Sequence, residues 1–208
     1  MMGRELVFSV KQSSREAATL QQKHKSNQDI SLPNISTKKG YTLVLDLDET
    51  LLCAKSVSNN LQDFIINIRP GAKEFIEEMS KYYELVIFTA GTKDYADYAL
   101  KFVDPEGRIV HRLYREHVIQ KGNTAVKDIS KLGRDLKKVI IIDNVAENFQ
   151  LHAANGIFIK TWEDDEKDTS LIDLMPILKQ IVELKVPDVR IALRHYRDCQ
   201  MRKVLNSI

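Results

Sequence analysis

YTLVLDLDETLL, residues 41–52, joins a short apolar run to two aspartates that are separated by one residue. The apolar run, 43–45, shows no alternation with polar side chains, which is typical of a central parallel strand covered on both faces. Charged side chains are excluded from such a strand, so we expect Asp46 and Asp48 where the strand leaves the sheet. Open α/β sheets bind their ligands at that carboxyl edge. The alternative is a turn capped by acidic residues, without further chemistry.

The composition is typical of a globular protein. The chain has 208 residues, of which 43% are hydrophobic and 29% charged, enough for one domain with tails and a substantial core. No apolar run approaches the ~20 residues needed to cross a bilayer, and the first residues lack the apolar core of a signal peptide. We therefore expect a nuclear or cytoplasmic protein without a transmembrane segment. The two cysteines, Cys53 and Cys199, make neither a disulfide framework nor a metal cluster.

Basic residues gather at the two ends of the chain. Residues 1–40 carry seven Lys and Arg against three Asp and Glu, and residues 185–208 carry six against two. Subtracting these from the 31 basic and 29 acidic residues of the chain leaves 18 against 24 in the part between, a charge of −6. Direct nucleic-acid binding by this acidic body is not expected. We predict a flexible basic segment over 1–37, a domain over 38–184, and a basic helix over 185–208 that packs on or extends the domain.

Strand and helix patterns alternate along the domain, which predicts an α/β fold with a doubly wound, mostly parallel sheet. The expected strands are 43–45, 63–68, 84–89, 139–144 and 156–160, with a short one at 6–10. The expected helices are 72–83, 92–103, 171–184 and 188–205, with Thr92, Asp168, Thr169 and Asp188 as caps. Residues 108–124 are short, charged and mixed, which indicates small strands and loops.

Three of the apolar strands end in polar side chains that one site can use. These are Asp46 and Asp48, then Thr89, then Asp143 and Asn144. The tips of parallel strands share one edge of the sheet, so the side chains are expected to converge. Carboxylate and amide oxygens are ligands that Mg²⁺ prefers. Lys127, before the third of these strands, can supply a further positive charge.

Together these residues predict a phosphoryl-transfer site. A phosphate monoester is a dianion, so Asp46 can attack it only if a metal and Lys127 neutralise the repulsion. Asp46 would then carry an aspartyl-phosphate. Asp48 can protonate the leaving oxygen and afterwards activate water. Thr89 would donate a hydrogen bond to a phosphoryl oxygen.

The segments DLDETLL, VIFTAGT, VKDISKLGRDL and VIIIDN resemble the four motifs of haloacid-dehalogenase-type phosphatases, which have a HAD-like Rossmannoid fold. The chain is most similar to the FCP/SCP and Dullard-type branch, serine phosphatases that act on the C-terminal domain of RNA polymerase II. The similarity runs from about Lys38 to Leu184 and includes KDYADYAL, HRLYREH and NGIFIKTW. The resemblance implies a phosphatase domain over 38–184 and a phosphorylated protein as substrate. The oligomeric state is not indicated.

The resemblance also implies a role for each site residue. Asp46 would be the nucleophile, Asp48 the acid/base, Thr50 a supporting hydroxyl, Thr89 the phosphate-binding hydroxyl and Lys127 the phosphate-orienting lysine. Asp143 and Asn144 would lie on the metal side. The Mg²⁺ ligands implied are Asp46, the Asp48 carbonyl oxygen and Asn144. Asp143 is expected to contact these ligands without binding the metal directly.

The chain departs from the family in two places. Val145-Ala146 replaces the Ser-Pro that usually follows Asp-Asn. The insert after the first motif is shorter than in polymerase-directed members, whose small extra sheet there helps to form the peptide pocket, so the polymerase tail is an open question as substrate. Two segments, 53–70 and 108–124, are candidates for a cap, and each is too short for a domain of ~50 residues. We therefore expect no large cap domain and an open cleft, which favours a protein segment over a metabolite.

The alternative function is a catalytically silent binding module, because the same fold serves in a mitochondrial protein-translocase receptor. The acidic and basic positions of the site are all present, which favours the enzyme. Structural roles are expected for a further group of residues: His111, His117 and His152 as hydrogen-bonding or surface residues, Trp162 as a cover for the core, and Arg134 with Asp135 as an ion pair. Cys53 is either a buried filler or a reactive thiol. The last helix is either an amphipathic edge of the domain or a surface for an acidic partner.

Overall fold

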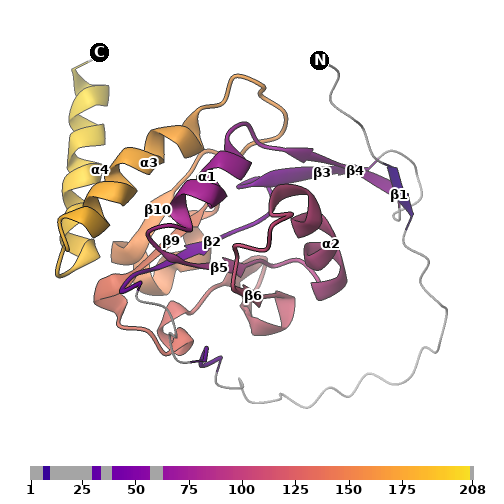
Figure 1. Ribbon diagram of the computed structural model, residues 1–208, viewed down its shortest axis with the longest axis horizontal. Coiled ribbons are helices and arrows are strands. Elements are labelled where there is room, and N and C mark those ends of the chain that lie inside the picture. Colours follow the sequence, from indigo (N-terminus) through magenta and orange to yellow (C-terminus); the bar gives the residue numbers. More distant parts are fainter. Residues whose placement is uncertain (1–6, 10–29, 34–38, 57–62, 207–208) are drawn as a thin grey trace.

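The computed structural model describes residues 7–9, 30–33, 39–56 and 63–206 (Figure 1). Most of the segment 1–37, which the sequence predicts to be flexible, lies outside these residues. Of the helices in the described residues, none is long and apolar enough to cross a membrane.

The centre of the fold is a five-stranded sheet in which all neighbouring strands are parallel. Its order is β10 (Gly156–Phe158), β9 (Val139–Asp143), β2 (Thr42–Leu45), β5 (Glu84–Phe88) and β6 (His111–Leu113). The predicted apolar strands are confirmed, and the run that ends in Asp46 is the central one. Strand β6 extends the sheet at its edge, where its sequence HRL has no apolar run to mark it.

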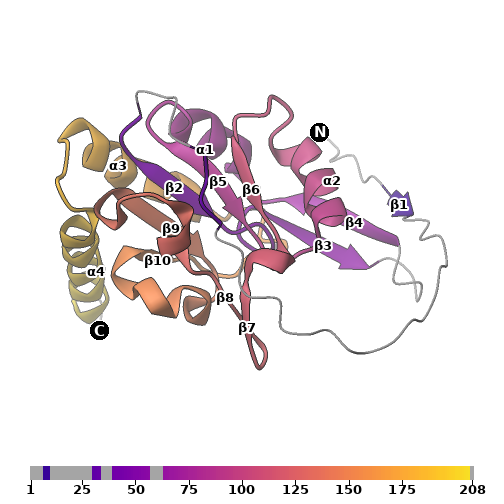
Figure 2. The ribbon, with the colours of Figure 1, turned by 90° about the horizontal axis from the view of Figure 1, so that it is seen from below.

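Alternation along the strands separates the core into two layers, one on each face of the sheet. On one face, Leu43, Leu45 and their neighbours pack against α-helices. These are α1 (Ala72–Met79), α2 (Lys93–Val103), α3 (Ser170–Glu183) and α4 (Val189–Leu205). On the other face, Val44 and Val86 pack against short 3₁₀ helices. They are η2 (Ile129–Leu132), η3 (Leu136–Lys138) and η4 (Ala146–Asn155), with η1 (Arg115–His117) beyond the edge strand. Figure 2 shows α1 above β2 and β5 in that view and the hairpin of β7 (Ile119–Lys121) and β8 (Thr124–Val126) below them.

Helix α1 begins at a turn that requires glycine. Gly71 has a φ of 75°, and a side chain there would come within 2.6 Å of Ile172 on α3. The helix ends at Met79, before the predicted end at 83. The chain must turn there, because Tyr83 is buried and its hydroxyl donates a hydrogen bond to the Leu178 carbonyl at 2.7 Å.

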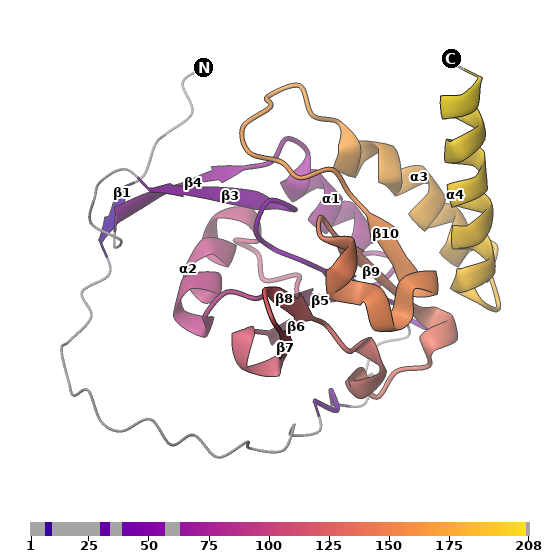
Figure 3. The same ribbon diagram turned by 180° about the vertical axis from the view of Figure 1, so that it is seen from behind.

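The insert after β2 contributes β3 and β4 to a small antiparallel sheet of order β1-β4-β3, and β1 comes from the chain before β2, so the shorter insert does carry a small extra sheet. Its strands are β1 (Val7–Ser9), β4 (Asp63–Ile68) and β3 (Leu52–Ser56). It lies beside α2, away from the helices α3 and α4 (Figure 3). The sequence predicts β4 and β1 from their patterns, but β3 begins directly after the acidic tip and shows no pattern of its own. A second hairpin pairs β7 (Ile119–Lys121) with β8 (Thr124–Val126).

The expected structural residues mostly hold their predicted places. Trp162 is buried, and so is Cys53, in agreement with a filler role. The three histidines bond to neighbouring groups: His111 to Glu84, His117 to the Tyr114 amide and His152 to Asp128. The predicted ion pair between Arg134 and Asp135 is wrong. Arg134 instead lies 2.8 Å from the buried Glu84 at the start of β5, and Asp135 caps η3.

Helix α4 packs on the domain through its first two turns. Asp188 accepts a hydrogen bond from the Arg190 amide at 3.1 Å, so it caps the helix as predicted. Val189 and Leu193 are buried, whereas from Arg194 onward every residue whose burial is described is exposed except the partly buried Tyr196. The helix is therefore an edge of the domain in its first half and a projecting basic helix in its second.

Candidate active site

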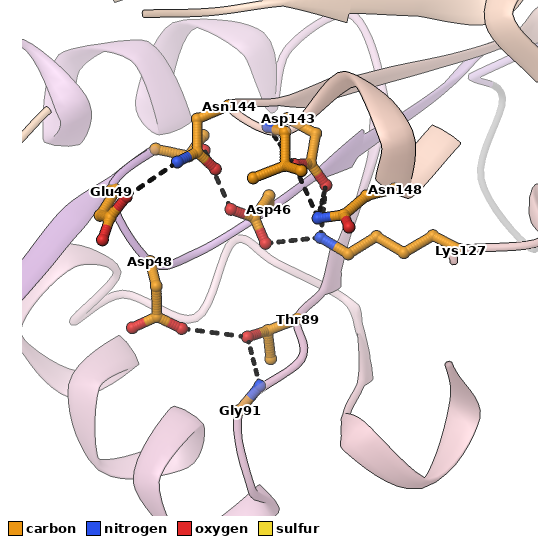
Figure 4. Close-up of polar contacts among 11 residues, drawn as sticks. Asp46, Asp48, Glu49, Thr89, Gly91, Lys127, Asp143, Asn144 and Asn148 are labelled. Atoms are coloured by element: carbon orange, nitrogen blue, oxygen red, sulfur yellow. Dashed lines mark hydrogen bonds and ion pairs between the residues drawn. The ribbon is translucent and has the colours of Figure 1, made fainter. Parts of the chain in front are cut away.

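The predicted site residues come together because the sheet aligns the ends of its strands. Leu45 of β2 pairs with Ile87 of β5 and with Ile142 of β9. The next residue along β2, Asp46, donates its amide hydrogen to the Ile142 carbonyl at 3.0 Å. Thr89 follows β5 at the same edge. The side chains that the sequence places at three strand tips thus converge on one point (Figure 4).

Lys127 is at the centre of this cluster and is fully buried. Its ammonium lies 2.5 Å from Asp46 Oδ1 and 2.6 Å from Asp143 Oδ2. Burial opposes the charge, but the carboxylates of Asp46 and Asp143 outweigh it, so the pKa of Lys127 lies above its ordinary value. The lysine therefore carries its positive charge between two aspartates that are about 100 positions apart in the sequence.

Asp143 is also held by groups from η4. Its Oδ1 accepts hydrogen bonds from the Val145 amide at 2.8 Å and from Asn148 Nδ2 at 3.1 Å. Asn148 in turn accepts the Lys127 amide hydrogen through its carbonyl at 2.6 Å. Burial and the nearby Asp46 raise the pKa of Asp143 to about 6, although Lys127 acts in the opposite direction. The sequence gives no signal for Asn148, which lies beyond the last recognisable motif.

The second oxygen of Asp46 faces Thr50 and Asn144. The Thr50 hydroxyl donates to Asp46 Oδ2 at 3.0 Å and lies 3.4 Å from Asn144 Oδ1. The amide nitrogen of Asn144 donates hydrogen bonds to Glu49 Oε2 at 3.1 Å and to Thr161 Oγ1 at 3.3 Å. Asn144 therefore turns its oxygen toward the same Thr50 hydroxyl that bonds Asp46, and sequence reasoning missed Glu49 and Thr161, which orient it.

Asp48 lies on the opposite side of the site and is partly buried. Its Oδ2 accepts a hydrogen bond from the Thr89 hydroxyl at 3.2 Å, and its Oδ1 accepts one from the Tyr95 hydroxyl. Burial raises the pKa of Asp48, and the neighbouring Asp46 adds to the rise, although these hydroxyls stabilise the charged form. A raised pKa suits a carboxyl group that must carry a proton at neutral pH.

The charges and oxygen atoms of the site fit a divalent cation. Asp46 and Asp143 share the single ammonium of Lys127, and Asp48 lies partly buried and close enough to Asp46 to raise its own pKa, so negative charge is in excess. Among the described residues no three His, Cys, Asp or Glu side chains are grouped so that they could hold a metal ion by themselves. A cation would need amide and carbonyl oxygens as well, which agrees with a ligand set of Asp46, Asn144 Oδ1 and the Asp48 carbonyl. Such oxygen ligands suit Mg²⁺.

A second buried cation supports the loop that carries the site. Arg69 lies at the end of the insert, and its Nη1 donates to the Thr50 carbonyl at 3.2 Å. Its Nε and Nη2 donate to the two oxygens of Asp168 at 2.7 and 2.8 Å. The sequence shows Arg69 only as part of a turn, Arg-Pro-Gly, and Asp168 only as a helix cap.

Comparisons with known proteins agree with this architecture. The model of the family described as NLI interacting factor-like phosphatase matches residues 41–190. A Dictyostelium discoideum protein named probable C-terminal domain small phosphatase is 40% identical over 171 residues, which cover 76% of this chain and 55% of the relative. The human carboxy-terminal domain RNA polymerase II polypeptide A small phosphatase 1 is 36% identical over 168 residues, 74% of this chain and 64% of the relative.

A relative with a different name shares the same region. The mitochondrial import inner membrane translocase subunit tim50 of Aspergillus fumigatus is 38% identical over 164 residues, 79% of this chain and 32% of the relative. The chain thus spans less than two thirds of the length of these relatives. The structure of Fcp1, described as an essential RNA polymerase II CTD phosphatase, superposes with a TM-score of 0.50 at 23% identity, over 76% of this chain and 53% of that one. This likeness supports the fold.

Proposed function

Since the chain belongs to the family of NLI interacting factor-like phosphatases, we propose that it is a Mg²⁺-dependent protein serine/threonine phosphatase that works through an aspartyl-phosphate on Asp46. The observation that carries the proposal is the placement of Asp46. One of its oxygens accepts a hydrogen bond from the buried Lys127 ammonium, and the other accepts one from Thr50, whose hydroxyl also lies near Asn144 Oδ1. A carboxylate held by an ammonium on one oxygen and a hydroxyl on the other is oriented for attack.

In the first step an oxygen of Asp46 attacks the phosphorus atom, and the bond from phosphorus to the serine or threonine oxygen breaks. Asp48 gives its proton to that leaving oxygen. Thr89 donates a hydrogen bond to a phosphoryl oxygen, and Lys127 balances part of the negative charge. Bound Mg²⁺ would supply the remaining positive charge that a dianionic substrate needs beside this acidic cluster.

In the second step a water oxygen attacks the phosphorus atom of the aspartyl-phosphate. Asp48, now deprotonated, takes a proton from the water, and the bond between Asp46 and phosphorus breaks to release inorganic phosphate. The residues that would hold Mg²⁺ are Asp46, Asn144 and the Asp48 carbonyl. Asp143 would hold Lys127 in place from the opposite side.

We further propose a phosphorylated protein segment as the substrate. Both insertions beside the site, the strands β3 and β4 and the β7–β8 hairpin, are small secondary-structure units, and neither has the size of a cap domain. An open site admits a chain segment more readily than it retains a small metabolite. The names of the relatives support the C-terminal domain of RNA polymerase II as one candidate. Such a substrate would be met in the nucleus or cytoplasm.

The test is phosphate release from phosphoserine, phosphothreonine and phosphotyrosine peptides, with and without Mg²⁺. Asp46→Asn removes the nucleophile and nearly preserves shape, so it should reduce turnover below detection. Asp198→Asn makes the same chemical change at an exposed position on α4 and should leave turnover unaltered. Metal-independent turnover, or an Asp46→Asn variant as active as the wild type, would rule out the proposed mechanism.

A catalytically silent binding module is the second candidate, and the tim50 relative is the observation that favours it. A wild type that releases no phosphate from any peptide, at any Mg²⁺ concentration, would support this candidate. The complete set of charged groups around Asp46 supports the enzyme.

A further inference from the structure

The acid/base candidate Asp48 is held by two hydroxyl groups, one on each of its oxygens. Thr89, after β5, donates to Oδ2 at 3.2 Å. Tyr95, in the first turn of α2, donates to Oδ1. The proposed function gives a task to Thr89 and to Asp48 and none to Tyr95.

The two hydroxyls differ in what they can do when substrate arrives. Thr89 Oγ1 accepts the Gly91 amide hydrogen at 2.9 Å. Its hydroxyl group has a single hydrogen, so it can donate only one hydrogen bond at a time. Once that hydrogen points to a phosphoryl oxygen, it can no longer point to Asp48. The contact between Thr89 and Asp48 is therefore temporary in the proposed mechanism.

Tyr95, in contrast, is anchored. Its ring packs against the core, and the next residue along α2, Ala96, is fully buried against the sheet. A phenol on a helix that is packed in this way keeps its position while the strand-tip hydroxyl turns. Tyr95 can therefore hold Asp48 Oδ1 before and after substrate binds.

We propose that Tyr95 is a positioning residue that keeps Asp48 Oδ1 as an acceptor, so that Oδ2, released by Thr89 when phosphate binds, carries the proton to the leaving oxygen. This inference rests on the proposed function and adds a residue to it. In the step concerned, the bond from phosphorus to the leaving oxygen breaks, and the proton on Asp48 Oδ2 moves to that oxygen. Tyr95 keeps its own proton throughout.

The need for a proton from Asp48 depends on the basicity of the leaving oxygen. A strongly basic leaving oxygen, such as an alkoxide or phenolate, needs the proton from Asp48 as the bond breaks, whereas 4-nitrophenolate leaves readily without it. Loss of the Tyr95 hydroxyl should therefore slow the basic leaving groups more. A general loss of fold or of phosphate binding would slow all of them equally.

The experiment compares kcat/KM of Tyr95→Phe and wild type on benzyl, phenyl and 4-nitrophenyl phosphate with Mg²⁺ present. These substrates are similar in size and differ in the basicity of the leaving oxygen, so contacts to a peptide do not enter. We expect a drop of about tenfold on benzyl and phenyl phosphate and less than about threefold on 4-nitrophenyl phosphate. Tyr98→Phe is the matched control: it lies three residues further along α2, where its ring packs edge-on against Phe102, and it should stay within about twofold of wild type on all three.

Equal losses on the three substrates, or no loss, would overturn the inference. If wild type is active, Asp46→Asn inert and Tyr95→Phe unimpaired, this inference fails and the proposed function stands. A wild type inert on all three substrates and on the peptide panel would overturn the proposed function and this inference with it.

Discussion

Among the residues that the structure describes, two cations, Lys127 and Arg69, are buried next to the same loop, and the two have different surroundings. Both side chains are fully buried. Arg69 has one partner carboxylate, Asp168, which it meets with two parallel hydrogen bonds. Lys127 lies between two carboxylates, Asp46 and Asp143. The pair of Arg69 is neutral, whereas the cluster of Lys127 keeps an excess negative charge.

The two cations also differ in how the pKa values of their partner carboxyl groups are shifted. Arg69 lowers the pKa of Asp168, because the guanidinium stabilises the carboxylate. Burial and Asp46 raise the pKa of Asp143 to about 6, because one lysine cannot compensate two carboxylates. Burial of a charge therefore does not by itself mark a functional site. An unbalanced set of buried charges does, because it is stable only if a further positive charge or a proton is bound.

The largest expected effect separates the two cations by activity. Lys127→Met leaves two carboxylates without a counter-charge and should reduce turnover by about 10³-fold or more. Arg69→Met removes the partner of Asp168 and should lower the free energy of unfolding by about 3–5 kcal/mol, while turnover stays within about tenfold where the variant is folded. Urea unfolding and phosphate release at 10 °C measure both quantities. A folded Arg69→Met variant as inactive as Lys127→Met would remove the distinction between the two regions.

A smaller effect distinguishes the two regions by the pH dependence of the free energy of unfolding. The pKa of Asp143 is raised in the folded state, so without Mg²⁺ this group should cost stability as pH rises from about 4 to 6. The pKa of Asp168 is lowered, so its contribution is present above about pH 4 and is lost as pH falls further. Denaturant unfolding of Mg²⁺-free protein from pH 3 to 7 measures both.

The two Asp→Asn variants assign these opposite slopes. Asp143→Asn should remove the loss of stability between about pH 4 and 6 and leave stability at neutral pH unchanged or higher. Asp168→Asn should lower the free energy of unfolding at neutral pH by about 3 kcal/mol, because Arg69 is left buried without a carboxylate. Two variants with the same pH profile would contradict the contrast.

The smallest effect tests whether the acidic cluster is arranged for a metal. Thr161→Val removes one of the two groups that bond the Asn144 amide nitrogen, at 3.3 Å, and should weaken Mg²⁺ binding by about tenfold. Addition of Mg²⁺ should then raise Tm less than in wild type. Thr169→Val is the control, since this exposed threonine bonds Asp173 and lies at the start of α3. An equal rise of Tm in wild type and both variants would show that Asn144 needs no orientation by Thr161.

The strands that carry the site could be predicted because their sequences are unambiguous. Residues 43–45, 84–89 and 139–144 are apolar runs that end in polar groups, and the structure finds β2, β5 and β9 there. The edge strand β6 and the insert strand β3 were not predictable in this way, because an exposed edge tolerates polar residues and a five-residue strand shows too few alternations. The roles of the site residues remain predictions for the experiments above.

Sequence patterns could not predict the partners of the buried charged side chains. Arg134 was expected to pair with its neighbour Asp135, but it bonds Glu84, 50 positions away. Arg69 and Asp168 are 99 positions apart. Such pairs depend on which loops the fold brings together, and nothing in the local sequence records that.

By itself the sequence determined the parallel α/β class, the strand tips that carry acid and amide groups, and the kind of chemistry those groups support. Short-range physics is sufficient for this, since a strand without polar alternation must be buried and its charges must leave at the end. Only the tertiary structure decided which of those groups are joined by hydrogen bonds or by one cation, that Lys127 faces two carboxylates and Arg69 one, and that Tyr95 reaches Asp48. These are contacts between segments whose distance in space is set by the packing of helices on the sheet, and the electrostatic balance of a buried group depends on every one of them.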